Sequence, residues 1–229
     1  MPNNTFILET IAQGFGDMLN QFVFVGGTVV ELYASSDTYQ EARQTDDVDC
    51  VVEVTSLANY YVLEEKLREL GFKDDMFEDA PICRKLYRGI KVDVMPTEEH
   101  ILKFSNRWYK EGFSNAQIHV LSSSTSIKIL PVSYFIASKL EAFFSSSRAH
   151  NNDVYASHDF EDIIYILDNC DNILTQIETS NDSVKNYIQN KFDYLLKNKP
   201  LIYALSGILR DDDNEIKVLK IIEQIASIQ

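Results

Sequence analysis

The sequence predicts an α+β fold, in which a mixed β-sheet domain with flanking helices is followed by an α-helical C-terminal domain. In the first half of the chain, short apolar runs bounded by turn residues alternate with segments of helical spacing, which is typical of a sheet covered by helices. From Pro131 onward the apolar residues follow helical spacing almost throughout. We therefore expect a sheet domain over residues 1–130 and a helical domain over residues 131–229.

Local spacing and turn signals predict the elements of the first domain. Helical spacing covers residues 6–21, and an amphipathic helix over 57–70 ends at Gly71, a natural C-terminal cap. Thr28 can cap a short helix after the first strand. Strands are expected over 22–25, 47–54, 72–77, 84–87, 90–95, 117–121 and 126–130, with a hairpin turn at Arg88-Gly89.

The second domain is predicted to consist of helices joined by polar connections. Apolar periodicity predicts helices over 132–145, 159–169, 183–197 and 215–228, with a shorter candidate over 200–209. The polar stretch 145–157 is expected to be a loop.

Composition narrows the class of protein. The apolar fraction of 45% and the aromatic fraction of 11% fit a folded chain. The three cysteines are far apart and have no metal-ligand spacing, which indicates free thiols in a reducing compartment. No apolar run is long enough to cross a bilayer, and the N-terminus lacks the features of a signal peptide. We expect a soluble cytoplasmic protein without a membrane partner.

The net charge of -14 bears on the choice of partner. A field of this sign repels a polyanion such as RNA unless positive charge is gathered locally. Two local basic clusters exist, namely Arg84, Lys85, Arg88 and Lys91, and Lys185, Lys191, Lys197 and Lys199. Because charge runs are usually solvated faces, the charge counts modestly against a nucleic-acid substrate without excluding one.

Three carboxylates lie inside strand-like runs, at Asp47, Asp49 and Asp93. Strict alternation places Asp47 and Asp49 on one face of their strand. Carboxylates in this arrangement can hold Mg²⁺ or Mn²⁺, which prefer oxygen ligands, and two such ions serve a displacement at phosphorus. The alternative is that Asp47 and Asp49 are ordinary solvent-facing residues. The order of a glycine turn, an aspartate pair and a third aspartate favours the metal site.

The glycine turn at Gly26-Gly27 follows a buried strand. Glycine leaves room for a triphosphate and presents backbone N–H groups to it. The hydroxyl of Thr28 offers a further phosphate contact. A long polar stretch over residues 35–44 separates this turn from the aspartate pair, and it suggests a mobile loop over the nucleotide site.

Two sets of motifs resemble known families. The signature of the nucleotidyltransferase superfamily related to DNA polymerase β is similar to Gly26-Gly27-Thr28 followed by Arg43-x-Thr45-x-Asp47-Val48-Asp49. The helical half of the AbiEii/AbiGii toxin family resembles a later segment with Lys139-Leu140-x-Ala142, then Arg148, then His158-Asp159-x-x-Asp162. The matched segments span about residues 22 to 167. His158 departs from the family, which often carries lysine or arginine there.

The resemblance implies a nucleotidyltransferase-type sheet domain and a role for each matched residue. Asp47 and Asp49 would bind the metals, and Asp93 would be the third carboxylate, nearest the attacking hydroxyl. Gly26, Gly27 and Thr28 would hold the triphosphate of an NTP. Lys139 would contact its phosphates, and Asp159 would sit beside Lys139 or act in proton transfer. Arg43 would reach a phosphate or pair with an aspartate, or is a solvated loop residue.

Physical arguments bear on two of these roles. Lys139 falls in an otherwise apolar helix, where an ammonium group needs an anion. The alternative is that the aliphatic part of the Lys139 side chain is buried while its ammonium group stays in water. Asp159 lies near a helix start, so capping competes with a catalytic role.

The leading hypothesis is a metal-dependent nucleotidyltransferase that transfers a nucleoside monophosphate from an NTP to a hydroxyl acceptor and releases pyrophosphate. The family resemblance implies the toxin of a toxin–antitoxin or phage-defence system, the 3′ end of a tRNA as a candidate acceptor, and a cognate antitoxin protein as partner. One alternative is an enzyme that modifies a small molecule, as antibiotic-modifying enzymes do, or a protein. Another is a non-catalytic nucleotide-binding module.

Overall fold

The computed structural model describes residues 3–35, 41–148, 150, 152–209 and 211–228, and the chain divides into two compact units. Unit 1 consists of Met1–Val29 and Arg43–Pro131, and unit 2 of Val30–Ala42 and Val132–Gln229. The two expected domains differ from these units in residues 30–42, which belong to unit 2, and in Pro131, which belongs to unit 1.

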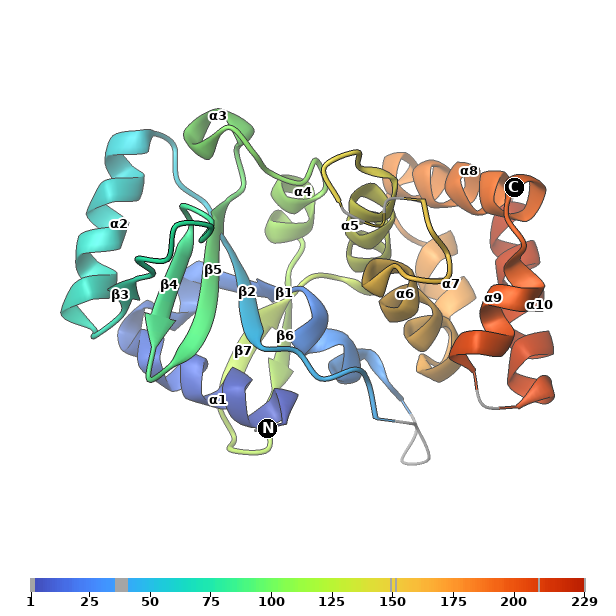
Figure 1. Cartoon of the computed structure of the whole chain (residues 1–229), viewed down its shortest axis with the longest axis horizontal. Helices are drawn as coiled ribbons and strands as arrows, with labels where there is room; N and C mark the ends of the chain where they lie inside the picture. The colour runs from blue at the N-terminus through green and yellow to red at the C-terminus, as the bar shows by residue number, and fades with distance from the viewer. Residues whose placement is uncertain (1–2, 36–40, 149, 151, 210, 229) are drawn as a thin grey trace. The chain divides into compact units, whose positions relative to one another are not determined.

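Unit 1 is built on a mixed sheet, as predicted. Within the described residues the sheet has seven strands in the order β3-β4-β5-β2-β1-β7-β6, and Figure 1 shows β4, β5, β2 and β1 side by side. The strands are β1 (Phe22–Val25), β2 (Asp47–Val52), β3 (Lys73–Asp74), β4 (Arg84–Tyr87), β5 (Ile90–Pro96), β6 (Gln117–Val120) and β7 (Ser126–Ile129). Two pairs, β2 with β5 and β1 with β7, are parallel, and the other pairs are antiparallel.

Helices flank this sheet in Figure 1. They are α1 (Asn4–Phe15), the 3₁₀ helix η1 (Gly16–Gln21), α2 (Leu57–Glu69), α3 (Glu99–Leu102) and α4 (Tyr109–Ser114), while the 3₁₀ helix η2 (Gly27–Tyr33) leads out of β1. The predicted continuous helix over 6–21 is wrong in its second half. The α-helix stops at Gly16, which takes a positive φ of 52° as the C-terminal cap, a conformation that glycine adopts without a steric cost.

Stacked aromatic rings pack α1 against the sheet. The ring of Phe15 lies 3.9 Å from that of Phe22 and 5.0 Å from that of Phe72, measured between centroids. On α2, the buried Tyr60 donates a hydrogen bond of 2.8 Å to the carbonyl of Val94 on β5. These contacts bury apolar surface and hold β1 and β5 in place, and both strands lead to the candidate site.

A buried lysine ties β4 to β3 and α2. The side chain of Lys85 is only 3% exposed, and its ammonium lies 2.6 Å from Oδ1 of Asp74 and contacts the carboxylate of Glu64. The hydrogen bond from Lys85 and its positive charge hold the pKa of Asp74 below its usual value. The expected solvated face at Arg84 and Lys85 is therefore wrong, because Lys85 lies inside the unit.

The depressed pKa of Asp74 predicts acid sensitivity. A carboxylate with a lowered folded-state pKa stabilises the fold above its unfolded pKa, and this contribution is lost as the pH falls through the folded value. We expect Asp74→Asn to lower the free energy of unfolding at pH 7, and to lose less of it than the wild type does between about pH 5 and pH 2. Urea unfolding at each pH measures this, with the exposed Asp79→Asn as control. An acid dependence equal to that of the wild type would contradict it.

Unit 2 is helical in the part that the structure describes. Its helices are α5 (Val132–Phe144), α6 (His158–Asn169), α7 (Ile173–Glu178), α8 (Asp182–Asn198), α9 (Leu201–Ile208) and α10 (Asp212–Ala226). Apolar side chains of α5, α6 and α8 form its core, among them Phe143, Phe160 and Phe192. None of the described helices combines the length and apolar character that a bilayer crossing needs.

The second half of η2, from Val30, and the residue Ser35 belong to this helical unit. The ring of Tyr33 packs 4.9 Å from that of Phe135 on α5, and the backbone N–H of Ser35 donates to the carbonyl of Asn169 at 3.0 Å. Residues 36–40, at the centre of the predicted loop over 35–44, lie outside the described residues.

Candidate active site

The glycine turn is in direct contact with the side chain of an aspartate. Gly26 follows the last residue of β1 and has a φ of +74°. A Cβ atom added at Gly26 would lie 2.0 Å from Oδ2 of Asp49 and 2.8 Å from its Cγ, distances at which atoms overlap. The Asp49 carboxylate thus lies against the α-carbon of Gly26, and both the backbone conformation and the contact require glycine here.

Cross-strand pairing aligns the carboxylates with this turn. Arg84 on β4 pairs with Asp93 on β5, Asp93 pairs with Asp49 on β2, and Asp49 pairs with Val25 on β1. Directly paired residues project from the same face of a sheet, so one row runs across four neighbouring strands, which Figure 1 shows side by side. Asp47 is two residues before Asp49 and projects from the same face. The structure therefore brings together the three aspartates that the sequence singled out.

Arg84 is the site residue that sequence reasoning missed. Its Nε donates to Oδ1 of Asp93 and its Nη2 to Oδ2, both at 2.7 Å, and Nη2 also lies 3.3 Å from Oδ2 of Asp47. The hydrogen bonds to Asp93 raise the pKa of Arg84 above its usual value. The signal was present in the sequence, because a two-residue turn at Arg88-Gly89 places Arg84 opposite Asp93.

The donor set suits a hard divalent cation in kind, because carboxylate oxygens are the ligands that Mg²⁺ prefers. Among the described residues, however, no group of three or more histidine, cysteine, aspartate or glutamate side chains is arranged to hold a metal ion. Two of the three candidate carboxylates, those of Asp47 and Asp93, contact Arg84 instead. The kind of donor therefore fits a metal ion, but the arrangement does not, because a guanidinium contacts two of the three carboxylates.

The neighbouring thiols stay protonated. Burial, together with the negative charges of Asp49 and Asp93, raises the pKa of Cys50 well above its usual value. Burial also raises the pKa of Cys83 to about 12. All three cysteines of the chain are free and buried.

The remaining predicted phosphate contacts of unit 1 differ in their surroundings. The hydroxyl of Thr28 is buried, and no described residue forms a hydrogen bond with it. Arg43 lies on the approach to β2, where its backbone carbonyl accepts from Asn4 and its Nη1 lies 3.4 Å from the carbonyl of Gln44. Asn4 also accepts from the backbone N–H of Thr45, so α1 holds the segment that leads into the aspartate pair.

Lys139 and Asp159 lie together in unit 2. The Lys139 ammonium is 3.1 Å from Oδ1 of Asp159 and 2.6 Å from Oδ2 of Asp162, and Arg148 lies 3.6 Å from the other Asp159 oxygen. Burial alone would lower the pKa of Lys139, but the two carboxylates raise it above its usual value. The side chain of Lys139 is only 11% exposed. Its ammonium group is therefore neutralised by the carboxylates of unit 2 rather than by water.

The start of α6 shows how Asp159 is placed. The N-cap of this helix is Ser157, whose hydroxyl accepts a hydrogen bond of 3.3 Å from the backbone N–H of Phe160. Asp159 lies inside the first turn, where its side chain contacts Lys139. Its contribution to proton transfer remains a prediction.

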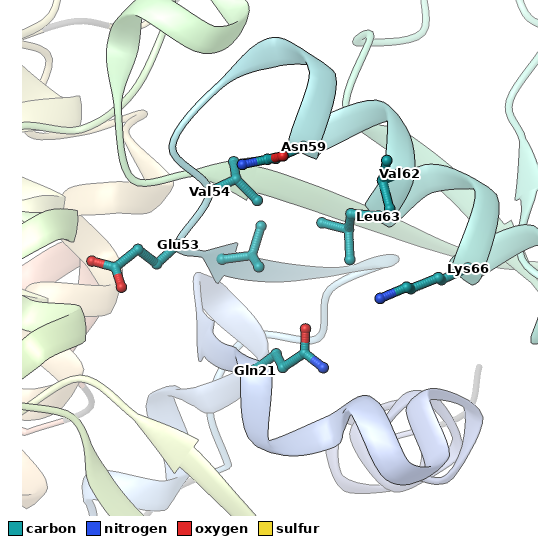
Figure 2. A pocket seen from close by; sticks show the side chains of 8 residues that line it. Gln21, Glu53, Val54, Asn59, Val62, Leu63 and Lys66 are labelled. Atoms are coloured by element: carbon teal, nitrogen blue, oxygen red, sulfur yellow. The ribbon is translucent and has the colours of Figure 1, made fainter.

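A separate pocket of about 220 Å³ lies at the other end of β2. It is lined by Gln21, by Val52, Glu53 and Val54, and by Asn59, Val62, Leu63 and Lys66 of α2. Figure 2 shows the Glu53 side chain extending away from the α2 side chains. Because Val52 and Asp47 are the two ends of the strand, about five residues or roughly 17 Å apart at strand spacing, this pocket is distinct from the carboxylate row.

Comparisons with known proteins show the fold. No family model matches the sequence, and no curated protein matches it. An antigenic nucleotidyltransferase-like protein from Paracoccidioides brasiliensis is 14% identical with a TM-score of 0.50, covering 92% of this chain and 95% of that one. A provisionally named nucleotidyltransferase from H. pylori is 13% identical with a TM-score of 0.46, covering 97% of this chain and 93% of that one. The first comparison identifies the α+β fold as that of a nucleotidyltransferase-like protein.

Proposed function

We propose that this protein is a metal-dependent nucleotidyltransferase, which transfers a nucleoside monophosphate from an NTP to a hydroxyl acceptor and releases pyrophosphate. The observation that carries the proposal is the position of Asp49, whose carboxylate lies against Gly26 while its cross-strand neighbour is Asp93. A phosphate-binding turn and oxygen ligands for a cation thus meet at one point of the sheet. Phosphoryl transfer depends mainly on such positioning and charge neutralisation.

The residues of unit 1 take distinct roles in this proposal. Asp47, Asp49 and Asp93 would hold Mg²⁺ or Mn²⁺, which neutralises phosphate charge when bound. Gly26 and Gly27 would present backbone N–H groups to the triphosphate, and the hydroxyl of Thr28, which accepts and donates no hydrogen bond among the described residues, is a candidate donor to it. The oxygen of the acceptor hydroxyl bonds to the α-phosphorus, the bond from that phosphorus to the leaving pyrophosphate breaks, and the hydroxyl proton passes to a carboxylate.

Residues outside the carboxylate row have supporting roles. We assign Arg43 and Lys139 to phosphate contacts, and Asp159 to holding Lys139 or moving a proton. The contact between Lys139 and Asp159 supports the assignment that Asp159 holds Lys139. For Lys139 to bind a phosphate, it must share its charge with Asp159 and Asp162, which already contact it.

The acceptor separates two versions of the proposal. By the AbiEii/AbiGii resemblance, the enzyme would be a toxin that modifies the 3′ end of a tRNA, with an antitoxin protein as partner. The net charge of -14, and the use of Arg84 and Lys85 in internal ion pairs, favour a cationic small molecule instead. Because the motif resemblance points to a tRNA acceptor, we retain tRNA as the first candidate, and the charge distribution makes the small molecule the second.

A labelling experiment tests the activity. We would incubate the protein with each α-³²P-labelled NTP, Mg²⁺ and total tRNA, beside Asp49→Ala and the control Asp46→Asn. Asp46 is an exposed carboxylate of the same segment on the opposite face of the strand. We expect label in tRNA with the wild type and Asp46→Asn, and a loss of about a hundredfold or more with Asp49→Ala, since removing a group that stabilises transition-state charge has this size of effect.

The other outcomes decide between the alternatives. Binding of an NTP that needs Mg²⁺, without label in RNA, would move the acceptor to a small molecule or a protein. Failure to bind any NTP would contradict the enzymatic proposal. Equal labelling by Asp49→Ala would show that the carboxylate row is not the catalytic site.

A further inference from the structure

We infer that Arg84 is the resident counter-cation of the carboxylate row, and that a divalent metal ion must displace it from Asp93 and Asp47 in order to bind. The inference rests on the proposed function and goes beyond it, because it assigns a role to a residue outside the predicted site. It concerns a positioning residue whose release accompanies the binding of metal.

The contacts of Arg84 are those that a metal would need. Its guanidinium binds both oxygens of Asp93 at 2.7 Å and reaches Oδ2 of Asp47 at 3.3 Å. A bidentate arginine–carboxylate pair is a strong and geometrically specific contact. A cation that took the same oxygens would have to lengthen or break these hydrogen bonds, so arginine and metal compete for one set of donors.

Burial explains why the carboxylates of the row need a cationic partner. The side chains of Arg84 and Asp93 are 18% and 11% exposed. A carboxylate withdrawn from water to this extent is costly unless it is paired, and Asp49 adds a second carboxylate as its direct neighbour in the row. Arg84 supplies the compensating positive charge to this row.

Release would also change what the arginine can bind. A guanidinium freed from Asp93 stays at the β4 end of the carboxylate row, with β5 and β2 between it and β1, which leads into the Gly26 turn. Planar guanidinium groups pair well with phosphate oxygens. Exchange would thus leave Arg84 free to pair with a phosphate oxygen that comes within reach of Asp93.

The test measures Mn²⁺ affinity directly, by the electron paramagnetic resonance signal of free Mn²⁺ without nucleotide. The variants are Arg84→Gln, Arg84→Lys and the control Lys91→Gln. Lys91 is an exposed cation on β5, the direct cross-strand neighbour of Asp47 and on the same face of the sheet as Asp93. It carries the same formal charge, and no ion pair to the aspartates is found for it among the described residues.

We expect Arg84→Gln to bind Mn²⁺ about tenfold more tightly than the wild type or better, within the usual range of coupling between two sites. Lys91→Gln should gain about threefold or less, because an exposed charge is screened. Arg84→Lys should fall between the wild type and Arg84→Gln, since an ammonium keeps the charge but loses the bidentate contact, and it serves as the folded variant if Arg84→Gln is unstable. Mn²⁺ should also raise the melting temperature of Arg84→Gln more than that of the wild type.

Each further outcome has a defined meaning. Equal or weaker Mn²⁺ binding by both Arg84 variants would overturn the inference and assign Arg84 to a permanent strand-to-strand contact. If the wild type still labels an acceptor in that case, the proposed function stands without the exchange. If Arg84→Gln gains Mn²⁺ affinity but no protein binds an NTP, the exchange stands and the proposed function fails.

Discussion

Gly26→Ala is expected to abolish nucleotidyl transfer and to lower the free energy of unfolding by about 2 to 3 kcal/mol. An alanine at a φ of +74° is strained, and its Cβ would overlap Oδ2 of Asp49 at 2.0 Å. Either the turn or the Asp49 carboxylate must move. A displacement of about 1 Å at reacting groups can cost a hundredfold in rate, so activity should fall further than stability alone explains.

Gly89→Ala is the matched control for the backbone. Gly89 also has a positive φ, of +82°, but a Cβ there would meet no atom within 4 Å. It should therefore cost about 1 kcal/mol, the usual penalty of the backbone alone, and leave activity in place. Urea unfolding and NTP labelling of both variants measure the difference. Equal losses of activity and of stability in Gly26→Ala and Gly89→Ala would show that the contact between Gly26 and Asp49 does not matter for activity.

Lys139→Met is expected to be the most destabilising change in unit 2, at about 3 to 5 kcal/mol. Methionine retains most of the volume but leaves the carboxylates of Asp159 and Asp162 without their ammonium partner, and the side chain of Asp162 is only 3% exposed. A buried carboxylate that loses an ammonium partner favours its protonated form more than before. We therefore expect this variant to gain stability as the pH falls, and Asp162→Asn in the same background to recover part of the loss.

The wild-type protein should lose the stability that the ion pairs of Lys139 provide only at high pH. Because the folded-state pKa of Lys139 is raised, its ion pairs stabilise the fold fully below the unfolded lysine pKa of about 10.4 and are lost only as the pH rises through the folded value. Lys197→Met is the control, since Lys197 and Asp193 form an exposed pair on α8 that is worth about 1 kcal/mol or less. A loss for Lys139→Met no larger than for Lys197→Met would contradict the prediction.

Much of the fold follows from local pattern. Alternation in β2 placed Asp47 and Asp49 on one face, and each predicted strand overlaps a strand of the described residues. The strand expected over 72–77 is wrong over most of its length, because only Lys73–Asp74 forms β3. The helix after Gly16 was extended wrongly, because apolar spacing alone does not reveal a backbone with positive φ. The short helices α3, α4 and α7 were not predicted, since segments of four to six residues carry too little periodicity.

The sequence by itself determined which strands form, which of their residues share a face, and, through the Arg88-Gly89 hairpin, that Arg84 lies opposite Asp93. Only the tertiary structure decided that β2 pairs in parallel with β5, that Asp49 packs on Gly26, and that residues 30–42 join the helical unit. These contacts join segments far apart in the chain. Periodicity and turn chemistry act over a few residues, whereas long-range pairing depends on how whole elements bury their faces against one another.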